Sequence, residues 1–411
     1  MIEMSQGPDN KRTLADIRGT VASDHLDLVR GLAALLVMVS HARVLFLESA
    51  GESVELGLIE KGLYILSGFG HQAVMVFFVL SGFFISSSVI RDVTGRTWSW
   101  RKYLTHRCTR LFVVLVPCLL LTVFWDSLGA YFLDASSPND DTGIAIISAD
   151  QISANSTVAA FVGNLLFLQT ICVPSFGSNT ALWSLSNEFW YYIIFPCVLL
   201  ASSKYNTGMM RLCFAALSVA IFCFIGKPIA IYFLVWLLGA LLSALPPLRQ
   251  LASRRNIIVA LVLAFTVFFA VLLAIGLRRI ERGLFADFLV ALSFGVCTYC
   301  LIHLRSPCRT GVYPKVARKI AGFSFSLYAL HLPPLIFLRA CFTSRVAWSP
   351  DVNHWCALGA IITLVMIYAW AISYLTERHT SSIRNWIVSR YSLHAYNLSA
   401  QTRGATQLKC D

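Results

Sequence analysis

Residues 25–43 read HLDLVRGLAALLVMVSHAR, an apolar run with Arg30 and His41 inside it. A helix needs about 20 mostly apolar residues to cross a bilayer, so this run predicts a membrane span. Arg30 and His41 are eleven residues apart, which places them within about 20° of each other on one helix face. An ionisable side chain inside a span is by default a functional-site hypothesis. Two interpretations stay open, because Arg30 can instead reach the headgroups while His41 hydrogen-bonds a neighbouring helix.

The composition extends this conclusion to the whole chain. Of 411 residues, 57% are hydrophobic and 13% are charged, against roughly 25% charged in a soluble domain. Runs of spanning length predict segments at 26–47, 71–90, 111–133, 181–201, 209–226, 228–245, 256–277, 283–304, 320–341 and 354–375. We therefore expect an all-α, polytopic integral membrane protein of about ten transmembrane helices. A cytoplasmic segment 1–25 would precede the membrane domain 26–375, and a cytoplasmic tail 376–411 would follow it.

The net charge of +12 raises the alternative of a nucleic-acid partner. The basic residues lie in short breaks between apolar runs and form no basic domain, so we expect no nucleic acid. With the N-terminus in the cytoplasm, most of the 33 lysines and arginines fall on inner segments, and the positive-inside rule puts both termini in the cytoplasm. Residues 1–25 lack the apolar core and cleavage site of a signal peptide, so the first span is expected to direct insertion.

One apolar stretch does not fit an even number of spans. Residues 158–173 read VAAFVGNLLFLQTICV and would make the number odd if they crossed the bilayer. We expect this stretch to be a re-entrant or surface helix.

A second cluster lies in the run 77–83, which reads FFVLSGF. Ser81 and Gly82 are small residues within an aromatic stretch, so they would let another backbone or a thin ligand approach closely. The alternative is that they serve only helix packing, which small residues favour in membranes.

Two later clusters also place polar groups where lipid makes them costly. Residues 182–191 read LWSLSNEFWY, and Glu188 there needs a partner or an aqueous cavity. Residues 326–331 read SLYALH, with Tyr328 and His331 adjacent on one helix face. Taken alone, His331 is more often a helix-packing residue than a catalyst.

In this order and at this spacing, the four clusters resemble the acyltransferase 3 family of integral-membrane acyltransferases. The matching stretches are Arg30 to His41 for an Arg-x10-His signature, Phe77 to Phe83 for a second-span motif, Leu182 to Tyr191 for a Trp-Ser-Leu-x-x-Glu motif and Ser326 to His331 for a late-span motif. The resemblance covers about residues 24–375. It implies transfer of an acyl group, commonly acetyl from acetyl-CoA, to a hydroxyl of an extracytoplasmic glycan, glycolipid or macrolide, at the bacterial inner (plasma) membrane.

The resemblance, together with the placement of charge, gives roles to particular residues. The catalytic residues would be His41, Arg30 and Glu188, with His41 as a general base or as a transiently acylated nucleophile. The donor, acetyl-CoA or another acyl-CoA, would contact Arg107, Arg110, Ser81, Tyr328 and His331. The other partners would be a glycan or glycolipid acceptor and membrane lipid. One departure concerns residues 107–117, where the proline that follows the paired arginines is displaced towards the span interior.

Other chemistry is less well supported. Cys297, Cys300 and His303 have metal-like spacing but no second ligand pair, so we expect no metal. The main alternative function is a transporter or flippase for a lipid-linked glycan, since intramembrane Arg, His and Glu would suit a proton-coupled carrier. That alternative predicts broken helices in two related halves, and the sequence shows no such internal symmetry.

Overall fold

The computed structural model describes residue 17 and residues 20–49, 57–132, 147–248, 253–304, 311–342 and 347–390. Within these ranges the fold is helical, and β-pairing is confined to isolated bridges such as Leu47 with Trp348. The outer parts of both predicted terminal segments, residues 1–16 and 391–411, lie outside the described residues. The expected all-α fold class is confirmed.

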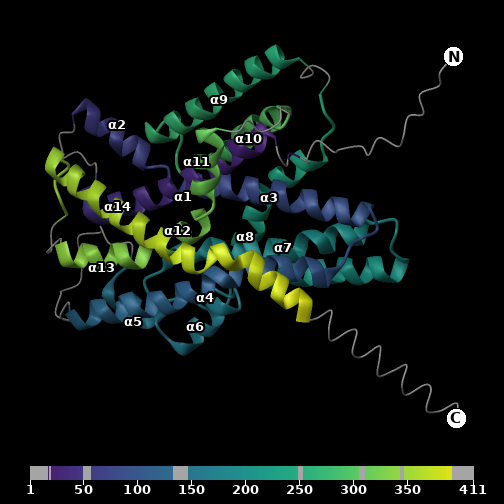
Figure 1. Cartoon of the computed structure of the whole chain (residues 1–411), viewed down its shortest axis with the longest axis horizontal. Helices are drawn as coiled ribbons and strands as arrows, with labels where there is room; N and C mark the ends of the chain where they lie inside the picture. Colours follow the sequence, from purple (N-terminus) through teal and green to yellow (C-terminus); the bar gives the residue numbers. More distant parts are fainter. Residues whose placement is uncertain are drawn as a thin grey trace, which may run out of the picture.

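The long helices follow the apolar runs of the sequence. The α-helices are α1 Val21–Phe46, α2 Leu58–Ser67, α3 Gly70–Thr94, α4 Trp100–Phe132, α5 Ala149–Asn155, α6 Val158–Leu165, α7 Trp183–Ser202, α8 Gly208–Ala244, α9 Arg254–Gly276, α10 Leu284–Leu301, α11 Val312–Ala321, α12 Ser324–Leu330, α13 Leu332–Phe342 and α14 Val352–Leu375. Short 3-10 turns precede α7 and follow α14. In Figure 1, α3 runs through the middle of the molecule with α9 and α4 on opposite sides.

Seven of the described helices are long and apolar enough to cross a membrane, or eight if one bent pair is a single span. Apolar side chains such as Val262 and Phe269 of α9 are more than half exposed, as expected where a helix faces lipid. These features confirm a polytopic membrane protein. The number of ten spans and the cytoplasmic position of both termini stay predictions.

Helix α8 contains both of the predicted segments 209–226 and 228–245. Its backbone leaves the helical region at Gly226, where φ is 74° and ψ is 172°. Phe222 and Phe233 have ring centroids only 5.5 Å apart, although eleven residues of straight helix would separate them by about 16 Å along the axis. The chain therefore turns back at Gly226, and the two arms of α8 correspond to the two predicted segments.

The predicted unbroken span 320–341 is interrupted. The chain from α11 to α12 and the following helix α13 meet at an angle of 61°, with His331 between α12 and α13. Pro333 and Pro334 cause this break, since neither residue has a backbone N–H to continue the hydrogen-bond ladder of α12. Hydropathy alone does not predict the break, because the apolar run continues across it.

Two other segments also differ in detail from expectation. Helix α4 begins at Trp100, eleven residues before the predicted span 111–133, so Arg107 and Arg110 lie on a helix rather than in a loop. The stretch 158–173 is helical only over α6, and the chain after α6 is irregular. Asn164 satisfies this irregular backbone by donating to the carbonyls of Ala160 and Pro174. Such side-chain hydrogen bonds permit non-helical backbone in a membrane protein.

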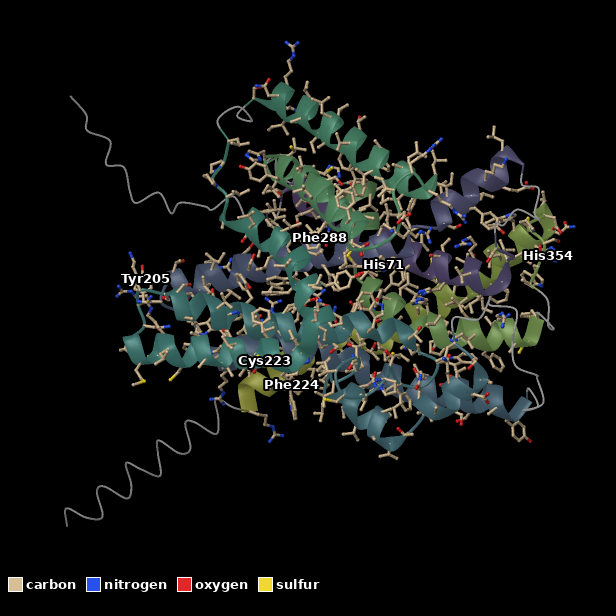
Figure 2. All side chains as sticks on the ribbon, turned by 180° about the vertical axis from the view of Figure 1, so that it is seen from behind. His71, Tyr205, Cys223, Phe224, Phe288 and His354 are labelled. Carbon is tan, nitrogen blue, oxygen red and sulfur yellow. The ribbon has the colours of Figure 1, made fainter. Side chains whose placement is uncertain are left out.

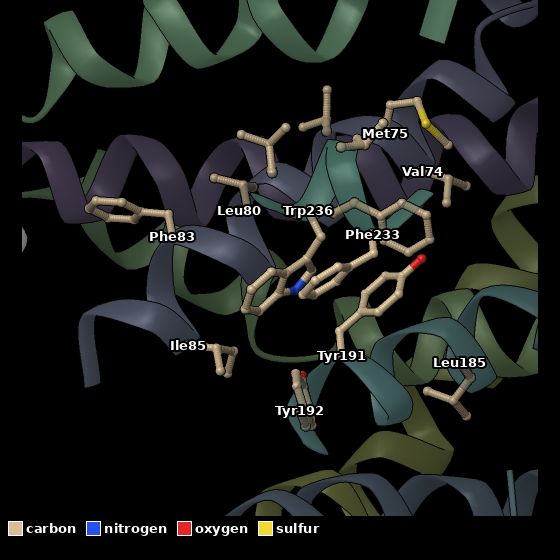
Figure 3. Close-up of a cluster of buried hydrophobic side chains, with 14 of the residues drawn as sticks. Val74, Met75, Leu80, Phe83, Ile85, Leu185, Tyr191, Tyr192, Phe233 and Trp236 are labelled. Carbon is tan, nitrogen blue, oxygen red and sulfur yellow. The ribbon is translucent and has the colours of Figure 1, made fainter. Parts of the chain in front are cut away.

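The core is organised around the crossing of α3 and α8. A Cβ atom built on Gly82 would lie 2.0 Å from the carbonyl oxygen of Trp236, and one built on Gly239 would lie 1.9 Å from that of Val79. The two helices thus touch backbone to backbone, which only glycine permits. Figure 3 shows the aromatic side chains beside this crossing, including Trp236 and Phe233.

Replacing Gly82 with valine is expected to push α3 away from α8, because the new side chain has no space at the backbone contact. The cost should be about 1–3 kcal/mol of stability or more. Thermal unfolding of the detergent-solubilised protein measures it. Gly359→Val is the matched control, since a Cβ atom added to Gly359 on α14 would have no neighbouring atom within 4 Å. Equal melting temperatures for the two variants would contradict the close crossing.

Candidate active site

A cavity of about 350 Å³ opens among α1, α3, α4, α7 and α12. Six of the eight predicted site residues line this cavity: Arg30, Ser81, Arg107, Arg110, Glu188 and Tyr328. They come from four motifs and the basic segment, which are far apart in the sequence. The fold thus brings these six residues together, and it joins the remaining two, His41 and His331, to each other.

Arginine side chains dominate the charge of the cavity. Arg30 forms an ion pair of 3.2 Å with Asp27 and donates to the carbonyl of Ala321, while its Nε has no partner among the described residues. Arg107 donates to the Ser88 hydroxyl at 3.0 Å and lies over the ring of Tyr192.

With Arg110, the wall carries three guanidinium groups against the carboxylates of Asp27 and Glu188. An excess of positive charge with unused N–H donors suits an anionic ligand that carries phosphate groups.

Glu188 belongs to a half-buried hydrogen-bond chain. Its Oε1 accepts from the Ser81 hydroxyl at 3.0 Å and from the hydroxyl of Tyr192. The indole N–H of Trp236 donates to the Ser81 oxygen at 3.2 Å. This chain supplies the partners that a carboxylate in a span requires. It also fixes Ser81 on the cavity wall, and it ties the α3–α8 crossing to α7.

His41 and His331 form a hydrogen-bonded pair. His41 Nδ1 lies 2.7 Å from His331 Nε2, and the two rings are nearly parallel with centroids 5.1 Å apart. His331 Nδ1 lies 3.0 Å from the carbonyl oxygen of Leu327 and 2.8 Å from that of Tyr328. Carbonyl oxygens only accept, so His331 Nδ1 carries the hydrogen.

The rest of the tautomer assignment follows from this carbonyl contact. In a neutral His331, Nε2 is the acceptor, so the hydrogen between the two rings belongs to His41 Nδ1. His41 Nε2 then holds a lone pair, and it has no partner among the described residues. The pair therefore presents one unprotonated imidazole nitrogen, which is able to take a proton or to attack a carbonyl carbon.

The helix break supplies the polar surroundings of His331. Without the N–H of Pro333, the carbonyl of Ala329 loses its helical donor. Asn179 Nδ2 donates to this oxygen at 2.8 Å, and the Cys118 thiol lies 3.0 Å from it. The break is thus stabilised from the segment before α7 and from α4. Asn179 is fully buried, as a group with this role must be.

Tyr328 connects the cavity wall with the histidine pair. Its hydroxyl lies 2.6 Å from the Ser184 hydroxyl and donates to the carbonyl of Ala181, and its ring contacts that of Phe77. Both rings line the cavity. The ring of Tyr328 also lies 6.2 Å from that of His331, so one side chain contacts both the cavity and the histidine pair.

Comparison with known proteins covers the region that contains these site residues. A family profile described as an acyltransferase domain matches residues 24–374. The chain belongs to the acyltransferase 3 family. As a member of this family the chain carries an acyltransferase domain, and the resemblance drawn from the four motifs is confirmed.

Curated relatives of this acyltransferase come from bacteria and a phage. An O-acetyl transferase of Shigella phage Sf6 is 32% identical over 178 residues, which cover 42% of this chain and 44% of that protein. Acyltransferase MdmB of Streptomyces mycarofaciens is 28% identical over 337 residues, which cover 74% of this chain and 76% of that protein. The match thus spans less than half of the phage relative. No solved structure matches the acyltransferase.

Several residues of the site have no signal in the sequence motifs. Asn179 and Cys118 donate hydrogen bonds to the Ala329 carbonyl, and Trp236 donates one to Ser81. Glu377, after α14, accepts hydrogen bonds from the backbone N–H and the hydroxyl of Ser326, near the start of α12. A donor to Ala329 was foreseeable, because Pro333 leaves that carbonyl without one.

The described residues contain no group of three or more His, Cys, Asp or Glu side chains arranged to hold a metal ion. His303, part of the metal-like spacing, instead accepts from the backbone N–H of Leu248 and contacts the carbonyl of Tyr299.

Substituting Asn179 with alanine should leave the Ala329 carbonyl with a weaker set of donors, at a cost of about 1–3 kcal/mol. We expect the break to relax, His331 to shift and kcat to fall. Melting temperature and transfer rate measure the two effects. Asn206→Ala is the control, because Asn206 caps the Leu200 carbonyl at the far end of α7. An unchanged kcat in Asn179→Ala would argue against this support for His331.

Proposed function

We propose that this enzyme transfers an acyl group, most simply acetyl, from cytoplasmic acyl-CoA to a hydroxyl of an extracytoplasmic glycan or glycolipid at a bacterial inner membrane. The observation that carries the proposal is the free Nε2 of His41, whose partner His331 lies beside Tyr328 on the wall of an arginine-lined cavity. The name of the phage relative, an O-acetyl transferase, supports acetyl as the group transferred. The relatives from Shigella phage, Streptomyces and Haemophilus support a bacterial membrane.

The cavity suits the donor because three guanidinium groups line it. Arg30, Arg107 and Arg110 offer N–H groups to the phosphates of CoA. Arg30 and His41 lie on one helix, about 16 Å apart along its axis. A donor held by its phosphates at Arg30 would extend its thioester arm along α1 towards His41, past Ser81 and Tyr328. In this arrangement the donor's arm, rather than the acceptor, crosses much of the bilayer.

The transfer step follows from the tautomer of the pair. His41 Nε2 takes the proton from the acceptor hydroxyl while the acceptor oxygen attacks the thioester carbonyl carbon. The new C–O bond forms, the C–S bond breaks, and the thiolate of CoA leaves. The imidazolium of His41 returns its proton to that thiolate, which gives free CoA and the O-acyl product. His331 holds the ring of His41 throughout, through the Nδ1 hydrogen bond.

Arg30 and Glu188 serve the donor in this proposal. Arg30 holds donor phosphate and balances charge near the inner end of the path. Glu188 acts through Ser81, since its Oε1 accepts from that hydroxyl and the cavity wall depends on it. A transporter needs no free imidazole nitrogen beside a cavity for a thioester, and the family match points to an enzyme.

Replacing His41 with alanine should abolish glycan-dependent release of free thiol from acetyl-CoA by at least about a hundredfold, as expected for a general base. The assay uses purified protein, acetyl-CoA and a crude extracellular glycan fraction. His303→Ala is the control, because His303 contacts only Leu248 and Tyr299 among the described residues. Comparable release by His41→Ala and wild type would remove His41 from the catalytic role.

Replacing Arg107 with glutamine should raise KM for acetyl-CoA about tenfold, since one charge-assisted contact to phosphate contributes about 1.5–3 kcal/mol. The KM for the acceptor should stay the same. Initial rates at varied acetyl-CoA concentration measure this effect. Arg254→Gln, at the start of α9, is the matched control outside the cavity. A larger change in acceptor KM than in donor KM would contradict donor binding at Arg107.

A further inference from the structure

A second set of polar and aromatic side chains lies outside the donor cavity. His71 is the second residue of α3, Trp183 begins α7, Tyr232 lies on the second arm of α8 and Asp287 lies on α10. None of the four lines the cavity that holds Arg30 and Arg107. Figure 2 places His71 between Tyr205, towards one end of the molecule, and His354, at the other.

Asp287 orients the imidazole of His71. Its Oδ2 lies 2.9 Å from His71 Nε2 and accepts from the Tyr232 hydroxyl at 3.0 Å. A carboxylate accepts, so Nε2 carries the hydrogen and the neutral ring keeps its lone pair on Nδ1. His71 Nδ1 has no partner in the part of the chain that the structure describes. The imidazole is 46% exposed, whereas the carboxylate is only 2% exposed.

The carboxylate itself is incompletely satisfied. Asp287 Oδ1 is buried and has no hydrogen-bond partner among the described residues. A buried carboxylate without full hydrogen bonding is costly, and in a membrane protein it marks a functional-site hypothesis. A purely structural contact between α3 and α10 would not need an exposed imidazole with a free nitrogen.

Aromatic rings surround the exposed imidazole. The Trp183 ring lies nearly parallel to it at 6.3 Å and 17°, and the Tyr232 ring meets it edge-on at 6.3 Å. The rings of Trp183 and Tyr232 are 5.9 Å apart. Aromatic faces beside a few fixed polar groups are the usual lining of an organic-ligand site. A sugar ring fits this chemistry, since its C–H face packs on an aromatic ring and its hydroxyls need hydrogen-bond partners.

The cluster adjoins the reactive pair. Gly70, the residue before His71, is packed so tightly on Ser40 that an added Cβ would lie 2.5 Å from the serine Cβ. Ser40 precedes His41 on α1. Trp183 is close to the pair in a similar way. Ala181, two residues before Trp183, accepts a hydrogen bond at its carbonyl oxygen from the hydroxyl of Tyr328. The cluster around His71 and the pair of His41 with His331 are therefore adjacent in the fold, linked by the contacts of Gly70 and of Ala181.

We propose that His71, fixed by Asp287 and Tyr232 and flanked by Trp183, is the acceptor subsite, and that its occupant is a sugar ring. His71 Nδ1 accepts a hydrogen bond from one sugar hydroxyl while Trp183 supports the ring, which leaves a second hydroxyl for His41. This inference rests on the proposed function, because it names the acceptor side of the same reaction. Asp287 is a positioning residue, since it acts through His71.

The test compares His71→Gln with wild type in the thiol-release assay, with methyl glycosides of glucose, galactose, mannose and rhamnose as acceptor probes. The glutamine amide N–H is able to replace Nε2 as the donor to Asp287, but the one acceptor of glutamine, Oε1, is not held at the position of Nδ1. We expect acceptor KM to rise about tenfold, as for one lost hydrogen bond to a ligand. The KM for acetyl-CoA and the melting temperature should stay within error of wild type.

His354→Gln is the matched control. His354 also pairs with a carboxylate, that of Asp351 at 2.7 Å, but this pair caps the start of α14. The control should change neither KM. Trp183→Leu is the second variant, and it should raise acceptor KM in the same way.

Three results would overturn the subsite. The first is an unchanged acceptor KM in both His71→Gln and Trp183→Leu. The second is an equal rise in both KM values with a lower melting temperature, which would make the cluster a structural contact. The third is a wild-type enzyme that hydrolyses acetyl-CoA slowly in a His41-dependent manner but transfers to no glycoside. Failure of the proposed function is distinguishable, because wild type would then show neither this hydrolysis nor binding of acetyl-CoA.

Discussion

The hydrogen bond between His41 and His331 is the interaction on which the site depends. It exists because a helix is broken at His331, where Pro333 and Pro334 end the ladder of α12. The carbonyls of Leu327 and Tyr328, at the end of α12, fix the hydrogen on His331 Nδ1, and this fixes the tautomer of both rings. Pro333 removes the helical donor of a further carbonyl, that of Ala329. In lipid such carbonyls would be very costly without donors. Asn179 and Cys118 therefore belong to the site although neither lines the donor cavity.

The close crossing of α3 and α8 serves the site in a second way. Because Gly82 and Gly239 let the two backbones touch, Trp236 reaches Ser81, and Ser81 in turn reaches Glu188. The carboxylate thereby gains its partners within the protein rather than from water. A packing feature and a polar network are here the same contact: Gly82 of the second-span motif lets another backbone approach, and the neighbouring Ser81 carries hydrogen bonds.

Much of the fold and of the site could be predicted, and the reason is that lipid restricts both. Apolar runs must be helices, so most helix limits fell within a few residues of the predicted spans, and costly polar residues such as Arg30 and Glu188 had to meet in a cavity. Contacts between side chains that are far apart in the sequence could not be predicted from hydropathy. Asn179 lies in an irregular segment without periodicity, and the pairing of His71 with Asp287 joins residues more than two hundred positions apart.

His41 and His71 are oriented by different partners, and this difference matches the roles proposed for them. His41 is held by a neutral imidazole, which costs less to bury than a charge and stabilises His41 as an imidazolium less than a carboxylate would. It is thus suited to accept a proton and give it up again within one reaction. His71 is held by a carboxylate, which favours a strong and lasting hydrogen-bond acceptor at Nδ1. A general base must release its proton again, so it needs a neutral partner such as His331. A residue that only binds a hydroxyl benefits from a carboxylate partner such as Asp287.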